Sequence, residues 1–126
     1  MYRPEDLKGM LFIDIETTSE FREFKEFEEN RPRAIEHWSR KADQYRRGGE
    51  HVEKTDAEMY QHMTALSPEF GKIRVISIGQ IQFEENGTTS ISKIKSFYGD
   101  DESELLREFL GTMQSVFDTK PGIKLI

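Results

Sequence analysis

The spacing of apolar residues alternates along the chain between the period of a strand and that of a helix, and these changes divide it into elements. Residues 10–15 form a nearly continuous apolar run, as in a strand that is covered on both faces. Two β-rich runs, at about residues 73–83 and 88–98, flank Asn86 and Gly87. An Asn-Gly pair between such runs predicts an antiparallel hairpin.

The charged stretch between the first strand and the hairpin has helical spacing. Phe21, Phe24 and Phe27 recur at that spacing, and Pro32 stands where a second helix can begin. The second helix carries these apolar residues on one side: Ala34, Ile35, Trp38, Ala42 and Tyr45. Aromatic side chains can stack on nucleic-acid bases, but a row at helical spacing is more often core, and we expect these residues in a core.

Two pairs of residues mark the starts of further helices. Thr55 and Glu58 match a capping box. The helix that follows carries Met59, Met63 and Leu66. Asp101 and Glu104 repeat the N-cap pattern in front of a longer apolar helix, and the final "IKLI" has the pattern of a strand that is just beginning.

The expected order is therefore strand, helical insertion at about residues 20–65, two hairpin strands, helix and strand. A parallel strand that closes a sheet after a crossover helix gives a mixed α/β sheet. Because 126 residues are about the length of one domain, we expect residues 1–126 to form a single domain or part of one.

Composition and charge limit the function classes. Apolar residues make up 35% and charged residues 33%, so part of the chain must be solvated helix and the core must be modest. The net charge of -6 argues against a protein that holds nucleic acid by a basic surface alone. A metal-dependent site tolerates this charge, because bound cations supply the local positive charge.

Cysteine is absent from the sequence, which excludes disulfides and cysteine-ligated zinc within it and suits a reducing cytoplasm. The longest clean apolar run is the four residues "MLFI", far shorter than a signal peptide core or a membrane span. We therefore expect a cytoplasmic protein with no membrane partner.

The first strand ends on two carboxylates, in "LFIDIETTSEF". Asp14 and Glu16 are two residues apart, so they project to the same side of the strand at its carboxyl end. Hard oxygen ligands of this kind select magnesium or manganese. Thr17 and Thr18 follow directly and offer hydroxyl and backbone hydrogen bonds to a nucleotide. The alternative is that the two acids merely mark a strand that runs into solvent.

"LFIDIETT" resembles the first motif of the DEDD (DnaQ-like) 3'-5' exonuclease superfamily, whose RNase H-like fold begins with a strand ending in D-x-E. "ALSPEFGKIRVISIG" resembles the segment that enters the second strand in the predicted DNA polymerase B-like 3'-5' exonuclease family. The hairpin and the "DDESELLREFL" helix continue in that family's order. The resemblance covers most of the chain except the charged region at about residues 20–52.

The resemblance implies a site with two divalent metal ions, Mg²⁺ or Mn²⁺, that activate water for attack on the terminal phosphodiester. Asp14 would bridge both metals, and Glu16 would hold the metal that carries the attacking water. The backbone around Ile15 to Thr17 would touch the terminal nucleotide. The partner would be nucleic acid, with a single-stranded DNA 3' end expected.

Two further aspartates and a Tyr or His base complete the family's site, in motifs that come after the strand starting at "IKLI". We therefore expect this sequence to be a truncated, amino-terminal part of the domain, inactive by itself because the complete site needs residues beyond Ile126. A shortened sheet also exposes an apolar face and a strand edge, which predicts self-association.

A rival hypothesis keeps the same fold without catalysis. In it, the chain is a nucleic-acid-binding or protein-interaction module that retains D-x-E by descent and meets its partner through the helical insertion. His51 and Asp56 have the spacing of another motif of the superfamily but precede the second strand, so we expect no catalytic role for them. We expect His37 and His62 on helix surfaces and Asp100 and Asp101 at a helix cap.

Overall fold

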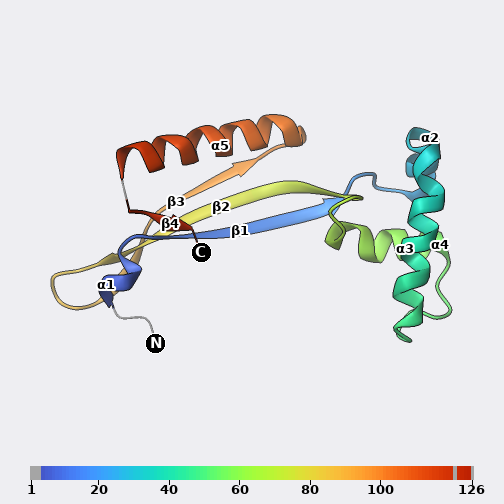
Figure 1. Ribbon diagram of the computed structural model, residues 1–126, viewed down its shortest axis with the longest axis horizontal. Helices are drawn as coiled ribbons and strands as arrows, with labels where there is room; N and C mark the ends of the chain where they lie inside the picture. The colour runs from blue at the N-terminus through green and yellow to red at the C-terminus, as the bar shows by residue number, and fades with distance from the viewer. Residues whose placement is uncertain (1–3, 121, 126) are drawn as a thin grey trace. The chain divides into compact units, whose positions relative to one another are not determined.

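The computed structural model describes residues 4–120 and 122–125, and Figure 1 shows the order of their helices and strands. The chain forms two compact units. Residues 1–16 and 73–126 make up the first, here called the sheet unit, and residues 17–72 make up the second, the helical unit. The boundaries fall inside two strands, β1 (Met10–Ser19) and β2 (Gly71–Phe83). The insertion expected at about residues 20–65 lies within the helical unit.

A four-stranded mixed sheet runs through the sheet unit in the order β3-β2-β1-β4. β3 (Thr89–Tyr98) pairs antiparallel with β2, whereas β4 (Lys124–Leu125) pairs parallel with β1. The parallel register places Met10 opposite Lys124 and Leu11 opposite Leu125. A short helix, α1 (Pro4–Leu7), precedes β1. The sequence-based expectation of a mixed α/β sheet closed by a parallel strand is therefore confirmed.

Helix α5 (Glu102–Thr119) connects β3 to β4 and packs on one face of the sheet (Figure 1). The buried core between them consists of Leu11, Ile76, Ile78, Phe97, Leu105 and Met113. Burial of each such side chain contributes about 1.5–3 kcal/mol. Asp101 caps the helix by accepting a 3.1 Å hydrogen bond from the Glu104 amide, as the sequence predicts. The Glu102 carboxylate also accepts the backbone N–H of Ile73, which attaches the helix start to β2.

The opposite face of the sheet, here called the open face, is less covered than the continuous apolar run in β1 predicts. Phe12 is 38% exposed, so the expectation of a strand covered on both faces is wrong. The physical reason is that α5 supplies cover on its own side alone. β1 also continues to Ser19, four residues beyond its expected end. Self-association through exposed apolar surface stays a prediction.

The hairpin between β2 and β3 turns at Asn86 and Gly87, as predicted. The Gly87 amide donates to the Glu84 carbonyl at 3.0 Å, and the Glu84 amide donates to the Thr88 carbonyl at 2.9 Å. Gly87 has φ +82°, a conformation that a side chain disfavours, which is why the turn takes glycine there. The ladder contains a β-bulge, because between the pairs Ile78–Lys95 and Gln80–Ser92 β3 has one residue more than β2.

The helical unit consists of α2 (Phe24–Asn30), α3 (Ile35–Arg47) and α4 (Asp56–Met63), with 3₁₀ turns at Pro32–Ala34 and Thr64–Leu66. These elements enclose a core of Phe27, Trp38, Ala42, Met59, Tyr60 and Phe70. Phe21, Phe24, Ala34, Ile35, Tyr45 and Met63 pack against it. The aromatic rows are therefore core, as expected.

Polar contacts fasten this aromatic core. The Trp38 indole N–H donates to the Asp56 carbonyl at 3.0 Å, and the Tyr60 hydroxyl accepts the Phe21 amide at 3.2 Å. The capping box of Thr55 and Glu58 is formed as predicted. Leu66 does not join the core and is 74% exposed, which contradicts its expected place on the apolar side of this helix. The α-helix ends at Met63, and the change to a 3₁₀ turn rotates Leu66 outward.

Asp56, which with His51 resembles another nuclease motif, has structural contacts in this unit. Asp56 forms an ion pair with Arg46, which also binds Asp43 and donates to the Lys54 carbonyl at 2.8 Å. Burial opposes ionisation of Asp56, but hydrogen bonds from Arg46 and Ser39 outweigh it and lower the pKa of its carboxyl. These contacts join α3 to the start of α4.

The loop before β2 is tied by Ser67 and Glu69. The buried Ser67 hydroxyl donates to the Glu69 carboxylate at 2.7 Å, and Lys41 approaches the same carboxylate at 3.3 Å. The hydrogen bond from Ser67 is the main cause that lowers the pKa of Glu69 from 4.5 to about 2. Across the described part of the chain, no helix has both the length and the apolar composition that crossing a bilayer requires.

Gly71 should not tolerate a side chain. A Cβ there would lie 2.9 Å from the carbonyl oxygens of Thr64 and Ser67 and 3.0 Å from that of Ala65. Gly71→Ala is therefore expected to lower the free energy of unfolding by about 1–3 kcal/mol. Gly111→Ala is the matched control, because nothing lies within 4 Å of its Cβ position, and it should stabilise by about 0.5–1 kcal/mol. Equal effects of the two changes in thermal unfolding would contradict this account.

Acid should weaken the helical unit in a defined pH range. Because the pKa of Glu69 in the folded state is about 2, its carboxylate contributes stability above about pH 4.5 that is lost as the pH falls toward 2. Lowered pKa values of Asp56 and Glu58 act in the same direction. The fluorescence of Trp38, the sole tryptophan, reports this unfolding from inside the unit's core. Glu69→Gln should flatten the pH dependence, and an unchanged slope would count against it.

Candidate functional site

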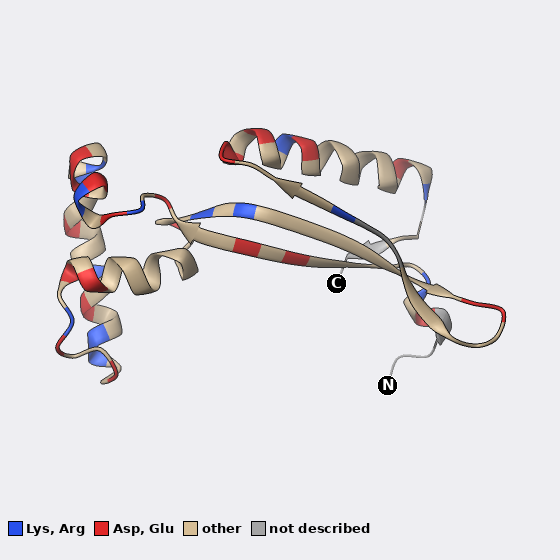
Figure 2. Cartoon of the chain, turned by 180° about the vertical axis from the view of Figure 1, so that it is seen from behind, with Lys and Arg blue, Asp and Glu red and all other residues tan. Residues whose placement is uncertain are grey.

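Asp14 and Glu16 lie together on the open face of the sheet unit. Leu11 is buried beneath α5 and Ile13 packs against the same core, so the alternation of β1 directs Phe12, Asp14 and Glu16 to the other face. Both carboxylates are exposed. Figure 2 shows the acidic positions of β1 in red. The sequence-based placement of the two acids on one side of the strand is therefore confirmed.

Neither carboxylate has a structural partner among the residues that the structure describes. Other acids of the sheet unit do: Asp100 pairs with Arg74 at 2.9 Å, and Asp101 caps α5. Two exposed carboxylates on one strand face repel each other unless a cation lies between them. A search of the described residues finds no group of three or more His, Cys, Asp or Glu side chains that could hold a metal ion, so Asp14 and Glu16 form at most part of such a site.

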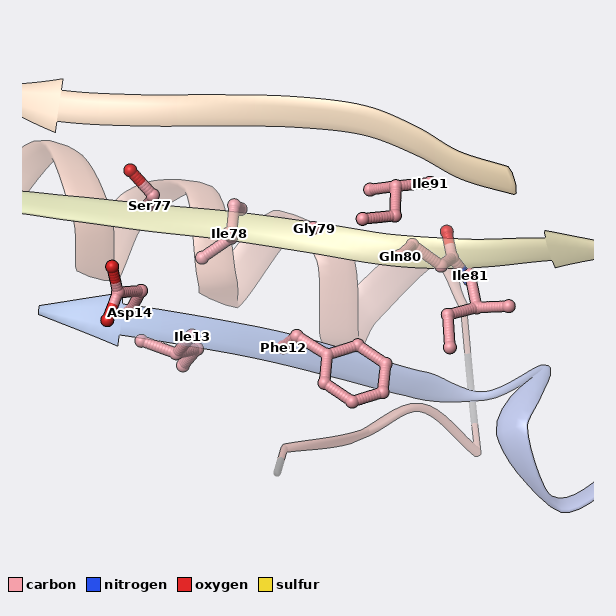
Figure 3. A pocket seen from close by; sticks show the side chains of 9 residues that line it. All are labelled: Phe12, Ile13, Asp14, Ser77, Ile78, Gly79, Gln80, Ile81 and Ile91. Carbon is pink, nitrogen blue, oxygen red and sulfur yellow. The ribbon is translucent and has the colours of Figure 1, made fainter. Parts of the chain in front are cut away.

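An apolar groove adjoins Asp14 on the open face (Figure 3). Its volume is about 370 Å³. The groove is lined by Phe12, Ile13, Asp14, Ser77, Ile78, Gly79, Gln80, Ile81 and Ile91. Asp14 lies at one end of these residues, and Phe12 and Ile81 lie toward the other (Figure 3). The groove therefore has a carboxylate at one end and apolar side chains at the other.

The β-bulge places Ile91 on the groove. Ser77 and Ser96 are paired residues, and their hydroxyls lie 2.8 Å apart. Farther along the hairpin Ile81 pairs with Ile91. Without the extra residue in β3, alternation would turn Ile91 to the face of α5, because a one-residue shift moves every side chain to the other face. Because Gly79 has no side chain, the groove is lined by backbone atoms between Ser77 and Ile81.

The three residues predicted to bind substrate differ in their surroundings. Ile15 is in the sheet unit, and alternation directs its side chain away from the face of Asp14. Thr17 and Thr18 belong to the helical unit. The Thr17 hydroxyl donates to the Ala65 carbonyl at 2.6 Å, and that of Thr18 donates to the Ser19 carbonyl at 3.2 Å. Their role in binding a nucleotide stays a prediction.

The arrangement offers hard oxygen ligands at one end and an apolar surface at the other. The first can hold a divalent cation, and the second can receive a flat, weakly polar group such as a nucleobase. Sequence reasoning found the carboxylates but missed the groove, which is formed by three strands. One signal was present, because Phe12 is two residues before Asp14 and must share its face.

Comparison of the chain with models of protein families, with curated proteins and with solved structures finds no match. The case for a function therefore depends on the residues and their geometry.

If Asp14 and Glu16 serve function rather than folding, neutralising them should not cost stability. Asp14→Asn and Glu16→Gln are expected to change the free energy of unfolding by less than about 0.5 kcal/mol, because neither carboxylate has a partner among the described residues. The control is Asp101→Ala, which removes the cap of α5 and should cost about 0.5–2 kcal/mol. A large loss of stability in Asp14→Asn, measured by thermal unfolding, would assign the carboxylate a structural role instead.

Proposed function

We propose that Asp14 and Glu16 are ligands for divalent metal ions in a 3'-5' exonuclease that removes nucleoside monophosphates from a nucleic-acid 3' end, with single-stranded DNA as the preferred substrate. The observation that carries the proposal is the pair of exposed, structurally unpartnered carboxylates on the open face of β1. The two like charges on one strand face repel each other, and a bound cation would relieve that repulsion.

The order of elements supports an RNase H-like fold as the finer description of the α/β architecture. A first strand that contains D-x-E, a hairpin, a helix and a strand parallel to the first follow one another as the family resemblance implies, although β1 continues three residues past Glu16. The helical unit then corresponds to an insertion after the first strand.

In this proposal each group has a separate task. Two metal ions, Mg²⁺ or Mn²⁺, supply a nucleophilic water and stabilise the departing 3' oxygen when bound. Asp14 and Glu16 would hold these ions through their carboxylate oxygens. The groove beside Asp14 would receive the base of the terminal nucleotide on Phe12 and Ile81. Ile15 would contact that nucleotide through its backbone.

Two carboxylates do not complete such a centre. With these two ligands alone, residues 1–126 are expected to have little or no nuclease activity. A cytoplasmic location is part of the proposal, supported by the lack of cysteine in the sequence.

Metal binding tests the proposal directly. Calorimetric titration of the chain with MnCl₂ or MgCl₂ should show weak binding, with a dissociation constant of roughly 10⁻³ M as for sites with few ligands. Asp14→Asn and Glu16→Gln should each abolish it. Asp118→Asn is the matched control, since it removes the same charge from the exposed end of α5 and should leave binding unchanged.

The MnCl₂ titration is then repeated in the presence of a nucleoside 5'-monophosphate, the product of the proposed reaction. The expected result is tighter binding of Mn²⁺ with the nucleotide present, an effect that Asp14→Asn eliminates. Metal binding that survives in Asp14→Asn, or Mn²⁺ binding that the nucleotide leaves unchanged, would refute the nuclease and favour the non-catalytic module.

A further inference from the structure

The outer side of α3 carries a row of arginines. Arg33, in the 3₁₀ turn before the helix, is followed by Arg40 and Arg47 at intervals of seven residues, and all three are exposed. Seven residues make nearly two helical turns, so the side chains share one side and are about 10.5 Å apart along the axis. The opposite side of α3 is held rigidly, because Trp38 and Ala42 are fully buried in the core of the helical unit.

Several other cations of the helical unit already form ion pairs. Arg31 pairs with Glu20 at 3.0 Å, Lys41 pairs with Glu69, and Arg46 binds two aspartates. By contrast, the structure gives none of the three row arginines an ion pair with a described residue. Their guanidinium groups therefore remain open to an external anion.

Acidic neighbours weaken the row only in part. Figure 2 shows basic and acidic positions mixed along this helix. Of the two acids in α3, Asp43 is already paired with Arg46, which leaves Glu36 beside the row. Gln44 is exposed between Arg40 and Arg47 and adds hydrogen-bond donors on the same side, whereas the His37 ring packs against Phe70 with ring centroids 5.4 Å apart.

We propose that Arg33, Arg40 and Arg47 bind the phosphates of a nucleic-acid strand that runs along α3. Guanidinium groups bind phosphate through two parallel hydrogen bonds, with geometry that lysine does not match. A strand with stacked bases rises about 3.4 Å per nucleotide, so the 10.5 Å interval corresponds to about three nucleotides. Successive arginines would thus contact phosphates about three nucleotides apart.

The chemistry of the row favours nucleic acid over a protein partner. Protein interfaces need apolar or aromatic anchors at their centre. None of the described large apolar residues that are exposed belongs to α3 or to the 3₁₀ turn before it; these residues are Phe12, Ile15, Val52, Leu66, Ile91, Tyr98, Leu110 and Phe117. A polar surface with unpaired arginines is typical of contacts with a nucleic-acid backbone.

This surface goes beyond the proposed nuclease site, because phosphate binding by arginine needs no metal ion and no carboxylate. The net charge of -6 repels polyanions at long range, so the binding is local and strongly dependent on salt.

The test measures binding of a fluorescently labelled single-stranded DNA oligonucleotide by anisotropy, in EDTA and over a range of salt concentrations. Three phosphate contacts to a single strand predict a slope of log K against log salt of about -2. The triple variant Arg33→Gln/Arg40→Gln/Arg47→Gln should lose most of this slope. The control is Arg22→Gln/Lys25→Gln/Arg107→Gln, which removes equal charge at other exposed positions and should retain the slope.

Equal losses of the salt slope in the two triple variants would overturn the proposal, because they would show that DNA binding depends on the net charge of the chain and not on the positions of the three arginines. No binding by the unaltered chain would overturn it too, as would tighter binding of polyglutamate than of DNA, which would assign the row to an acidic protein. Thermal unfolding of both variants verifies that they fold. Because the measurement is made in EDTA, it does not depend on metal held by the carboxylates, so failure of the nuclease proposal and failure of this one are distinguishable.

Discussion

The burial of Leu11 beneath α5 sets the direction of the side chains along β1. Because side chains alternate along a strand, fixing Leu11 and Ile13 in the core commits Phe12, Asp14 and Glu16 to the open face. A one-residue slip of β1 would bury both carboxylates against apolar side chains, at a cost far above any gain in packing. The core and the candidate site are therefore two results of a single register, which the parallel pairing of Leu11 with Leu125 also defines.

The elements that the sequence predicts well are those whose signals are local. Thr55 and Glu58, or Asp101 and Glu104, are three residues apart and interact across one helical turn, so the pattern contains nearly all the physics. Gly87 similarly determines its own turn. The burial of β1 side chains depends instead on which face of the sheet α5 packs against. The spacing of residues within β1 contains no information about that. The groove depends on three strands and a bulge, and Leu66 depends on where an α-helix gives way to a 3₁₀ turn.

The helical unit combines a rigid interior with a polar exterior. Phe27 and Tyr60 have ring centroids 4.9 Å apart, and Trp38 meets Phe70 edge-on at 5.1 Å. Such aromatic pairs contribute about 0.5–1.5 kcal/mol beyond the area they bury. Ion pairs on the outside join α3 to α4 and to the loop before β2. Side chains on the outer side of α3 therefore stand on a fixed support, which limits the entropy that a ligand must remove on binding.

The bulge in the hairpin also limits how the length of this chain can vary. Opposite Gly79, between the pairs formed by Ile78 and Gln80, β3 contains one residue more than β2. Beyond this point, the additional residue determines which face of the sheet each side chain of β3 lies on. Deleting a single residue from β3 there would leave both strands intact but exchange inside for outside over the far part of the hairpin. Loops tolerate insertions and deletions of one residue. In this strand, such a change would exchange the side chains of the two faces over the far part of the hairpin.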